Sequence, residues 1–208
     1  KTYLKHSRRV LEAQTATQNG IETSIGKIDY PKLVARKDQV VATLQGGIHY
    51  LFKNNKVTYF EGEAHFNVDG SLRVGENVLE AQDIILATGS HPFVPPIKGL
   101  EKVDFLTTDT FFEMRELPQK LVVIGGGVIA VELAFALQPL GTAVTLLEVA
   151  DDILLTEDED ARQIIKEKLQ TLGIKVKTKV KIEEVSSTGV KLKDGTNFAF
   201  DKLLVAAG

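Results

Sequence analysis

The stretch LVVIGGGVIAVE, from Leu121 to Glu132, constrains the fold more than any other part of this 208-residue chain. Four apolar residues, 121–124, have the length and composition of a buried strand. The apolar run Val128–Leu137 fits a helix, and three consecutive glycines separate the two elements. The pattern therefore predicts the first strand and helix of a βαβ unit.

The sequence that follows continues this alternation. Pro139 and Gly141 end the helix, and Ala143–Leu147 is typical of a second buried strand. An amphipathic helix is expected over Glu157–Leu172. Three further strands are expected at Lys175–Glu184, Gly189–Leu192 and Leu203–Ala207. The fold class predicted is α/β, with a short doubly wound, Rossmann-like domain.

The glycines fit a dinucleotide-binding fingerprint. Gly125, Gly127 and Ala130 match G-x-G-x-x-G/A, and Glu148 closes the next strand at the expected distance. A glycine pattern alone would equally fit a structural turn, but here a strand, a helix and an acidic residue accompany it. We therefore expect a nucleotide-binding loop, in which three more residues contribute backbone: Gly126, Val128 and Ile129.

Each position has its own physical reason. Gly125 permits the tight strand-to-helix turn, and Gly127 lets a pyrophosphate approach the backbone. Ala130 is small enough for the helix to pack on the strand. The unpaired N–H groups at the helix N-terminus favour phosphate.

Glu148 predicts the cofactor. A carboxylate accepts hydrogen bonds from both ribose hydroxyls and repels a 2′-phosphate. Residues 149–152 contain no Arg or Lys that would receive that phosphate. NAD is favoured over NADP.

Glu132 admits two interpretations. A carboxylate one turn into a helix is favourable near the helix N-terminus and needs no further role. Alternatively, it is a buried acid with a cationic partner at a reaction centre. The residues alone leave both open.

The N-terminal part has a different texture. A helix is expected over Lys1–Gln18, ending at Asn19-Gly20. A second should begin at Asp29-Tyr30-Pro31, with Asp29 as cap, and run to Asn54-Asn55. Gly46-Gly47 predicts a break or close packing inside it. Short segments then indicate an antiparallel meander: Val57–Phe60, Ala64–Val68, Ser71–Val74, Asn77–Leu79 and Asp83–Ala87.

A proline-rich crossing follows the meander. Pro92, Pro95 and Pro96 lie within five positions and mark the best domain boundary. We expect two domains, 1–92 and 93–208.

Composition excludes several other classes. The formal net charge is −3, and the chain has no cysteine and no run of apolar residues long enough for a membrane span. These features predict no nucleic-acid or membrane partner, and a cytoplasmic location fits. The four histidines lack metal-ligand spacing, so no metal is expected. The lysines at 175, 177, 179 and 181 alternate, as on a solvated strand face.

In combination, these segments resemble the pyridine nucleotide–disulfide oxidoreductases, most closely the dihydrolipoamide dehydrogenase and mercuric reductase branch. LVVIGGGVIAVELA is similar to that family's NAD fingerprint, and ILATGS to its flavin-domain motif. TLLEVADDILLTEDEDA and GGIHYLFKNNKVTYFEGEAHF also match, in the family's order. Val128 and Glu148 depart from the glutathione reductases, which often have Tyr and Arg there.

The resemblance implies FAD and NAD as cofactors and assigns further residues. A partial FAD-binding domain would occupy 1–92 and the NAD-binding domain 93–208. Lys1 and Glu132 would form an ion pair beside the flavin. Four FAD contacts are implied at Ala64, Thr88, Gly89 and Ser90, and two more NAD contacts at Val180 and Gly208.

The resemblance also implies that the chain is a fragment. The redox cysteine pair would lie before Lys1, and a dimer domain with a catalytic His would follow Gly208. The parent would be a homodimeric, FAD-dependent and NAD-linked oxidoreductase acting on a small disulfide or dithiol, and the fragment alone would be inactive. Two alternatives stay open: a non-disulfide NADH:flavin reductase or NADH oxidase, and a non-catalytic NAD-binding module.

Overall fold

The glycine-rich stretch lies at the centre of a five-stranded parallel sheet in the computed structural model, which describes residues 1–207. The strand order is β4-β11-β5-β6-β7, and the pairing of neighbouring strands continues without a bulge. The strands are β4 (Phe105–Leu106), β5 (Lys120–Ile124), β6 (Ala143–Leu147), β7 (Lys175–Lys177) and β11 (Lys202–Val205). The prediction of an α/β fold with a parallel sheet is confirmed.

The chain divides into two units, which are described separately. A large unit comprises Lys1–Lys37 and His91–Gly208, and a small unit comprises Asp38–Ser90. The proline-rich crossing at 92–96 begins just after the boundary at Ser90. The assignment of 1–92 to FAD and 93–208 to NAD stays a prediction.

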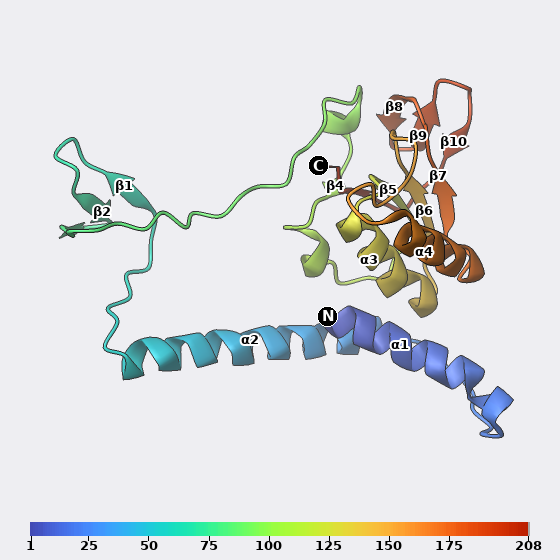
Figure 1. The fold of residues 1–208 in the computed structure, drawn as a ribbon, viewed down its shortest axis with the longest axis horizontal. Helices are drawn as coiled ribbons and strands as arrows, with labels where there is room; N and C mark the ends of the chain where they lie inside the picture. Colours follow the sequence, from blue (N-terminus) through green and yellow to red (C-terminus); the bar gives the residue numbers. More distant parts are fainter. Residues whose placement is uncertain (208) are drawn as a thin grey trace. The chain divides into compact units, whose positions relative to one another are not determined.

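The large unit has three layers. Residues of β5 alternate between two cores, so that Leu121 and Val123 face one side, and Val122 and Ile124 the other. Three helices cover the first side: α1 (Thr2–Thr15), α3 (Val128–Leu137) and α4 (Glu159–Thr171). Figure 1 shows α3 and α4 alongside the sheet. Strands β8 (Ile182–Ser186), β9 (Gly189–Leu192) and β10 (Asn197–Phe198) form an antiparallel sheet, and its apolar residues share the second core.

Helix α1 belongs to the large unit because it packs on α3. The Ser7 hydroxyl donates to the carbonyl oxygen of Ala136, and Tyr3 is buried against Tyr30 and Phe111. Three of this unit's short 3₁₀ helices lie between its strands and helices: η2 (Leu100–Lys102), η3 (Phe111–Glu113) and η4 (Gln138–Leu140).

The expected helix ends are largely confirmed. Helix α1 continues as the 3₁₀ helix η1 (Ala16–Asn19) and stops at Gly20, whose φ of 80° suits glycine. Asp29 caps α2 (Tyr30–Asn54), because its Oδ1 accepts from the Lys32 N–H at 3.2 Å. The expected break at Gly46-Gly47 is wrong: α2 runs through both glycines, and nothing packs closely on them. Each glycine weakens a helix by only about 1 kcal/mol, which the long flanking turns offset.

A single strand over Lys175–Glu184 is also wrong. Strand β7 ends at Lys177, and β8 begins at Ile182 in the other sheet. Between them Lys179 adopts a positive φ of 56°, which turns the chain out of the parallel sheet.

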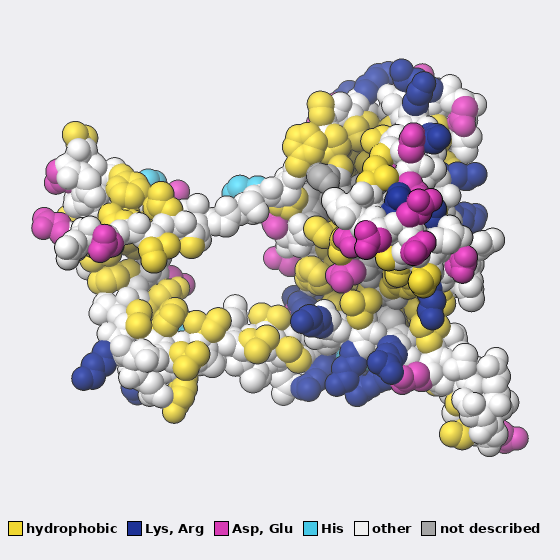
Figure 2. Space-filling view, viewed as in Figure 1, with side chains coloured by type: hydrophobic (Ala, Val, Ile, Leu, Met, Phe, Trp, Pro, Cys, Tyr) yellow, Lys and Arg dark blue, Asp and Glu magenta, His cyan; other side chains and the backbone are white. Residues whose placement is uncertain are grey.

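The small unit holds a three-stranded antiparallel sheet of β1 (Ala64–Phe66), β2 (Leu72–Val74) and β3 (Asn77–Leu79). The predicted strands at Val57–Phe60 and Asp83–Ala87 are not formed, because no strand in residues 1–207 pairs with them. Apolar side chains there are exposed, with Ile85 92% and Leu86 68% accessible. Figure 2 shows many hydrophobic side chains on this unit's surface.

Within residues 1–207, no helix combines the length and the apolar character needed to cross a membrane.

Candidate dinucleotide-binding site

The glycine turn leaves the sheet where three strands end. The Gly125 N–H donates to the carbonyl of Leu147 at 2.9 Å, and the Ala206 N–H donates to that of Ile124 at 2.9 Å. Gly125 has a φ of +124°, and a Cβ there would lie 2.3 Å from the Ala206 carbonyl oxygen. Only glycine satisfies both the conformation and the close approach.

The next two glycines have different surroundings. A Cβ on Gly126 would lie 2.7 Å from Ile153 Cγ2 and 2.9 Å from Glu148 Oε2, so its backbone is covered by protein. A Cβ on Gly127 would meet no protein atom within 4 Å. Gly127 is also the N-cap of α3 and makes no side-chain cap, so the first-turn N–H groups face open space. This open helix start fits a phosphate group.

Ala130 lies on the buried face of α3 and is fully buried against the parallel sheet. Val128 and Ile129 lie on the opposite face and are 47% and 49% exposed. Glu132, one turn after Val128, is exposed on that same side. The exposed side of α3 therefore carries two apolar side chains, Val128 and Ile129, and one carboxylate, Glu132.

Glu148 directly follows β6, and backbone hydrogen bonds hold it through both its N–H and its carbonyl. Its N–H donates to the Lys177 carbonyl at 2.8 Å, and its carbonyl accepts from the Val180 N–H at 3.1 Å. Its side-chain Oε1 accepts from the Ala150 N–H at 2.7 Å. The second carboxylate oxygen therefore stays beside Gly126, half-buried and fixed in direction.

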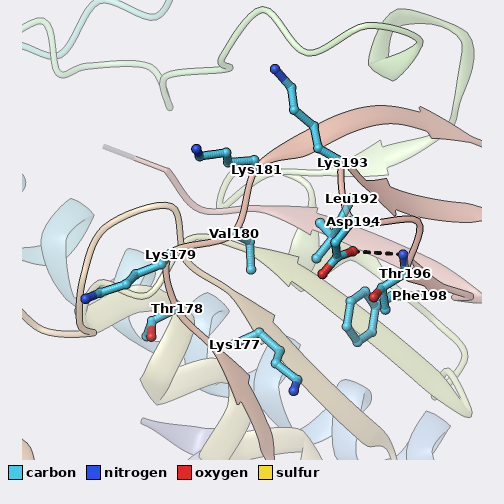
Figure 3. Close-up of a pocket in the computed structure, with 10 residues that line it drawn as sticks. All are labelled: Lys177, Thr178, Lys179, Val180, Lys181, Leu192, Lys193, Asp194, Thr196 and Phe198. Carbon is cyan, nitrogen blue, oxygen red and sulfur yellow. Dashed lines mark hydrogen bonds between the residues drawn. The ribbon is translucent and has the colours of Figure 1, made fainter.

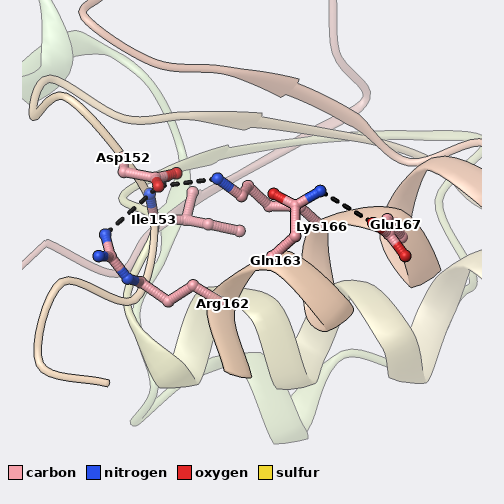
Figure 4. A network of polar contacts seen from close by, with 6 residues as sticks. All are labelled: Asp152, Ile153, Arg162, Gln163, Lys166 and Glu167. Carbon is pink, nitrogen blue, oxygen red and sulfur yellow. Dashed lines mark hydrogen bonds and ion pairs between the residues drawn. The ribbon is translucent and has the colours of Figure 1, made fainter. Parts of the chain in front are cut away.

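An ion network anchors the loop that follows β6. Asp152 Oδ2 accepts from Lys166 Nζ at 2.9 Å and from Arg162 Nη1 at 3.3 Å, as Figure 4 shows. The hydrogen bond from Lys166 is the largest cause lowering the pKa of Asp152 below its ordinary value, while desolvation acts in the opposite direction. The neighbouring Leu154 N–H donates to the Gly126 carbonyl at 2.9 Å, which ties the loop to the glycine turn.

This ion network was not predicted from the sequence. The spacing of Arg162 and Lys166, four residues apart on one face of α4, could have indicated a shared anionic partner.

Two cavities adjoin the turn. One of about 680 Å³ lies over the N-terminus of α3 and includes Gly127, Val128 and Ile129. The other, of about 480 Å³, includes Glu148, Val149 and Val180. Gly126, Gly127 and Glu148 line both cavities, as does Phe93. The arrangement offers adjoining spaces for the two halves of a dinucleotide on either side of the glycine turn.

A segment distant in sequence brings one lysine into this site and a second one next to the loop after β6. The Lys179 N–H donates to the Ala150 carbonyl at 2.8 Å, and its Nζ lies 3.7 Å from Asp151 Oδ1. Lys181 lines the 480 Å³ cavity together with Glu148. Sequence reasoning placed both on a solvated strand and missed their proximity to Glu148.

The remaining predicted residues are distributed as follows. Lys1 and Glu132 are exposed, and no ion pair joins them in the part of the chain that the structure describes; their pairing beside a flavin stays a prediction. Ala64 lies in β1, paired with Val74. The remaining three predicted FAD contacts are exposed and outside regular structure: Thr88, Gly89 and Ser90.

Val180 is buried at the wall of the smaller cavity, 7% exposed. Gly208 lies outside the described residues. The cofactor contacts proposed for all these positions stay predictions.

Comparisons with known proteins agree with this geometry. The family model described as pyridine nucleotide-disulphide oxidoreductase matches residues 4–208. The dihydrolipoyl dehydrogenase of Acholeplasma laidlawii is 33% identical over 217 residues, covering 100% of this chain and 64% of that protein. The mercuric reductase of Staphylococcus aureus is 33% identical over 178 residues, covering 85% of this chain and 32% of that protein.

Solved structures give the same result. The HOCl-induced flavoprotein disulfide reductase RclA from Escherichia coli matches with a TM-score of 0.81 and 28% identity, covering 100% of this chain and 46% of that one. This chain thus spans less than two thirds of the length of each of these three proteins. On sequence and structure alike, the chain belongs to the pyridine nucleotide-disulphide oxidoreductase family, whose members use FAD and NAD(P).

Proposed function

We propose that this chain binds NAD(H) at the glycine turn and is part of an FAD-dependent, NAD-linked disulfide oxidoreductase of the dihydrolipoamide dehydrogenase type. One observation carries the proposal. The fixed Glu148 carboxylate and the open N-terminus of α3 at Gly127 lie on the two sides of Gly126. An acceptor for ribose hydroxyls and a set of donors for phosphate are therefore neighbours in one site.

Each part of the site has a distinct role in this proposal. The first turn of α3 holds the pyrophosphate through its N–H groups and partial positive charge. Glu148 accepts hydrogen bonds from the adenosine ribose, and Val180 supports the adenine from the cavity wall. The exposed pair Val128 and Ile129 would give the nicotinamide half an apolar surface.

When bound, nicotinamide and flavin would supply the hydride donor and acceptor. In this chain, Lys1 and Glu132 are the proposed flavin-side charges, because the resemblance pairs them there. Glu132 lies one turn beyond Val128, on the exposed side of α3 that also bears the nicotinamide surface. Proposed FAD contacts come from Ala64 and from residues 88–90. The resemblance also supports a homodimeric parent with a small disulfide or dithiol as substrate, and we propose a cytoplasmic location, which fits the composition.

Calorimetric titration of the chain with NADH tests the nucleotide site. We expect saturable binding of one NADH per chain. Glu148→Arg should weaken it by at least about tenfold, because a charge-assisted acceptor for the ribose is lost. Glu116→Arg makes the same change of charge at an exposed residue outside both cavities and should bind NADH normally. Equal affinities for the two variants would contradict the role of Glu148.

A further inference from the structure

We propose that Lys181, with Lys179 beside it, forms a cationic subsite that fits the 2′-phosphate of NADPH and that the Glu148 carboxylate keeps it from use. The inference rests on the proposed function, since it concerns the same adenosine-ribose position. It names the residues that set the choice between NADH and NADPH.

The first observation is location. Lys181 lines the 480 Å³ cavity that also contains Glu148 and Val149. Lys179 is joined to the loop after Glu148 twice, through its N–H to Ala150 and through its Nζ to Asp151. Residues 149–152 themselves carry no cation, so these two lysines supply from another segment the charge that this loop lacks.

The second observation is that the segment is fixed. Three consecutive residues are held by backbone hydrogen bonds: Lys179 donates to Ala150 at 2.8 Å, Val180 donates to Glu148 at 3.1 Å, and Lys181 accepts from Lys193 at 2.8 Å. The lysine Cα positions are therefore set before any ligand arrives. A preformed site loses less entropy on binding than a mobile loop does.

The third observation is direction. Figure 3 shows Lys179 and Lys181 both extending to the left of the segment, whereas Lys177 extends downward to the right and Lys193 extends upward. In residues 1–207, the ammonium of Lys181 has no carboxylate within ion-pairing distance, and that of Lys179 has only the exposed Asp151. The Lys181 ammonium is therefore available to an incoming anion, and the Lys179 ammonium can exchange the exposed Asp151 for one.

The charge of Glu148 opposes that use. A 2′-phosphate would replace a ribose hydroxyl donor with a dianion directly beside the carboxylate, at a half-buried position where repulsion is poorly screened. The lysines attract the same dianion. The unsubstituted chain therefore prefers NADH because repulsion by Glu148 exceeds attraction by the lysines. Removing the charge of Glu148 should allow the lysines to bind the 2′-phosphate.

A charge cycle tests the subsite. The affinities of NADH and NADPH are measured by calorimetry for the unsubstituted chain, Glu148→Gln, Lys179→Gln/Lys181→Gln and the triple variant. We expect Glu148→Gln to raise NADPH affinity by at least about tenfold. In the lysine-substituted background the same change should raise it by less than about threefold. The gain should shrink at 0.5 M salt, because exposed lysines are screened.

A matched pair controls for net charge. The double variant Lys177→Gln/Lys193→Gln also removes two positive charges, from the other two lysines of Figure 3. It should leave unchanged the increase in NADPH affinity that Glu148→Gln produces. Inorganic phosphate up to millimolar concentrations should not abolish the gain, because the ribose and pyrophosphate contacts also hold NADPH.

The outcomes separate the two proposals. If the unsubstituted chain binds no NADH, the proposed function fails and the subsite fails with it. If NADH binds but Glu148→Gln brings no gain for NADPH, the subsite alone is overturned. An equal increase in NADPH affinity with and without Lys179 and Lys181 would also overturn it, since the loss of repulsion by Glu148 would then account for the whole increase.

Discussion

Gly125, Gly126 and Gly127 are adjacent in the chain but meet different neighbours. At Gly125 a side chain is excluded by the φ of +124° and by a clash with the Ala206 carbonyl. At Gly126 a side chain would clash with Ile153 and Glu148. The third adopts a φ of −74°, which any residue can adopt, and has free space around it. Of these three glycines, only Gly127 has room for a side chain in the folded protein, which fits a bound phosphate as the reason for glycine there.

This contrast predicts that one small substitution lowers mainly stability and the other lowers mainly NADH affinity. Gly125→Ala should lower the free energy of unfolding by at least about 2 kcal/mol, because it adds strain and a backbone clash. Gly127→Ala should lower stability by no more than about 1 kcal/mol, because alanine is a poorer N-cap than glycine, yet weaken NADH binding at least about tenfold, since the methyl group occupies the phosphate position. Urea unfolding and calorimetric titration of both variants measure the two effects. Normal NADH binding by a well-folded Gly127→Ala variant would contradict the phosphate assignment.

At the scale of elements, the loop between β6 and α4 depends on one carboxylate. Asp152 holds two cations of α4, while Ile153 is buried and Leu154 bonds to Gly126. The helix is thereby linked to the glycine turn through three consecutive loop residues. A change on α4 can therefore alter the nucleotide site without touching a ligand.

Asp152→Asn should lower stability by roughly 1 kcal/mol near neutral pH and reduce NADH affinity a few-fold, because the loop loses its ionic anchor. Because the pKa of Asp152 is lowered by folding, its contribution is present above the ordinary value of 3.8 and is lost as the pH falls through the folded pKa. Urea unfolding of both proteins from pH 7 to pH 3.5 should show their difference begin to shrink only at the acidic end. Asp158→Asn is the control, since Asp158 is the N-cap residue of α4, its side chain makes no cap hydrogen bond, and Asn is an equally good N-cap residue. A difference between Asp152→Asn and the unsubstituted chain that is constant with pH would exclude the ionic role.

At the scale of the whole molecule, the two units differ in burial. The large unit has two cores on the two faces of the parallel sheet. In the small unit only Ser71 and Val74 are buried, and most of its apolar side chains are accessible to water. A three-stranded sheet with so little burial gains little of the hydrophobic stabilisation that opposes chain entropy.

Hydrogen–deuterium exchange should therefore distinguish the units. Amides in β5, β6 and β11 should exchange at least about 100-fold more slowly than amides in β1, β2 and β3, because local opening costs less free energy in the small unit. NADH should slow exchange near Gly126 and Glu148 and leave the small unit unchanged. Equal protection of the two sheets in the free chain would contradict this difference in stability.

The sequence by itself determined the elements whose signals are local. The bounds of α3 and β6 were predicted to the residue, because an apolar helix after glycines and a short apolar strand are encoded in adjacent positions. The glycine turn and Glu148 followed from the same local pattern. The family resemblance was also readable, and the match over residues 4–208 confirms it.

Only the tertiary structure decided what depends on pairing between distant segments. It left Val57–Phe60 and Asp83–Ala87 without strand partners, and it divided Lys175–Glu184 between two sheets. It also placed Lys181 in the same cavity as Glu148, although the two residues are thirty-three positions apart in the sequence. The physical reason is common to all three: strand pairing and charge proximity act through space, and a strand or a lysine has the same local sequence whatever it meets.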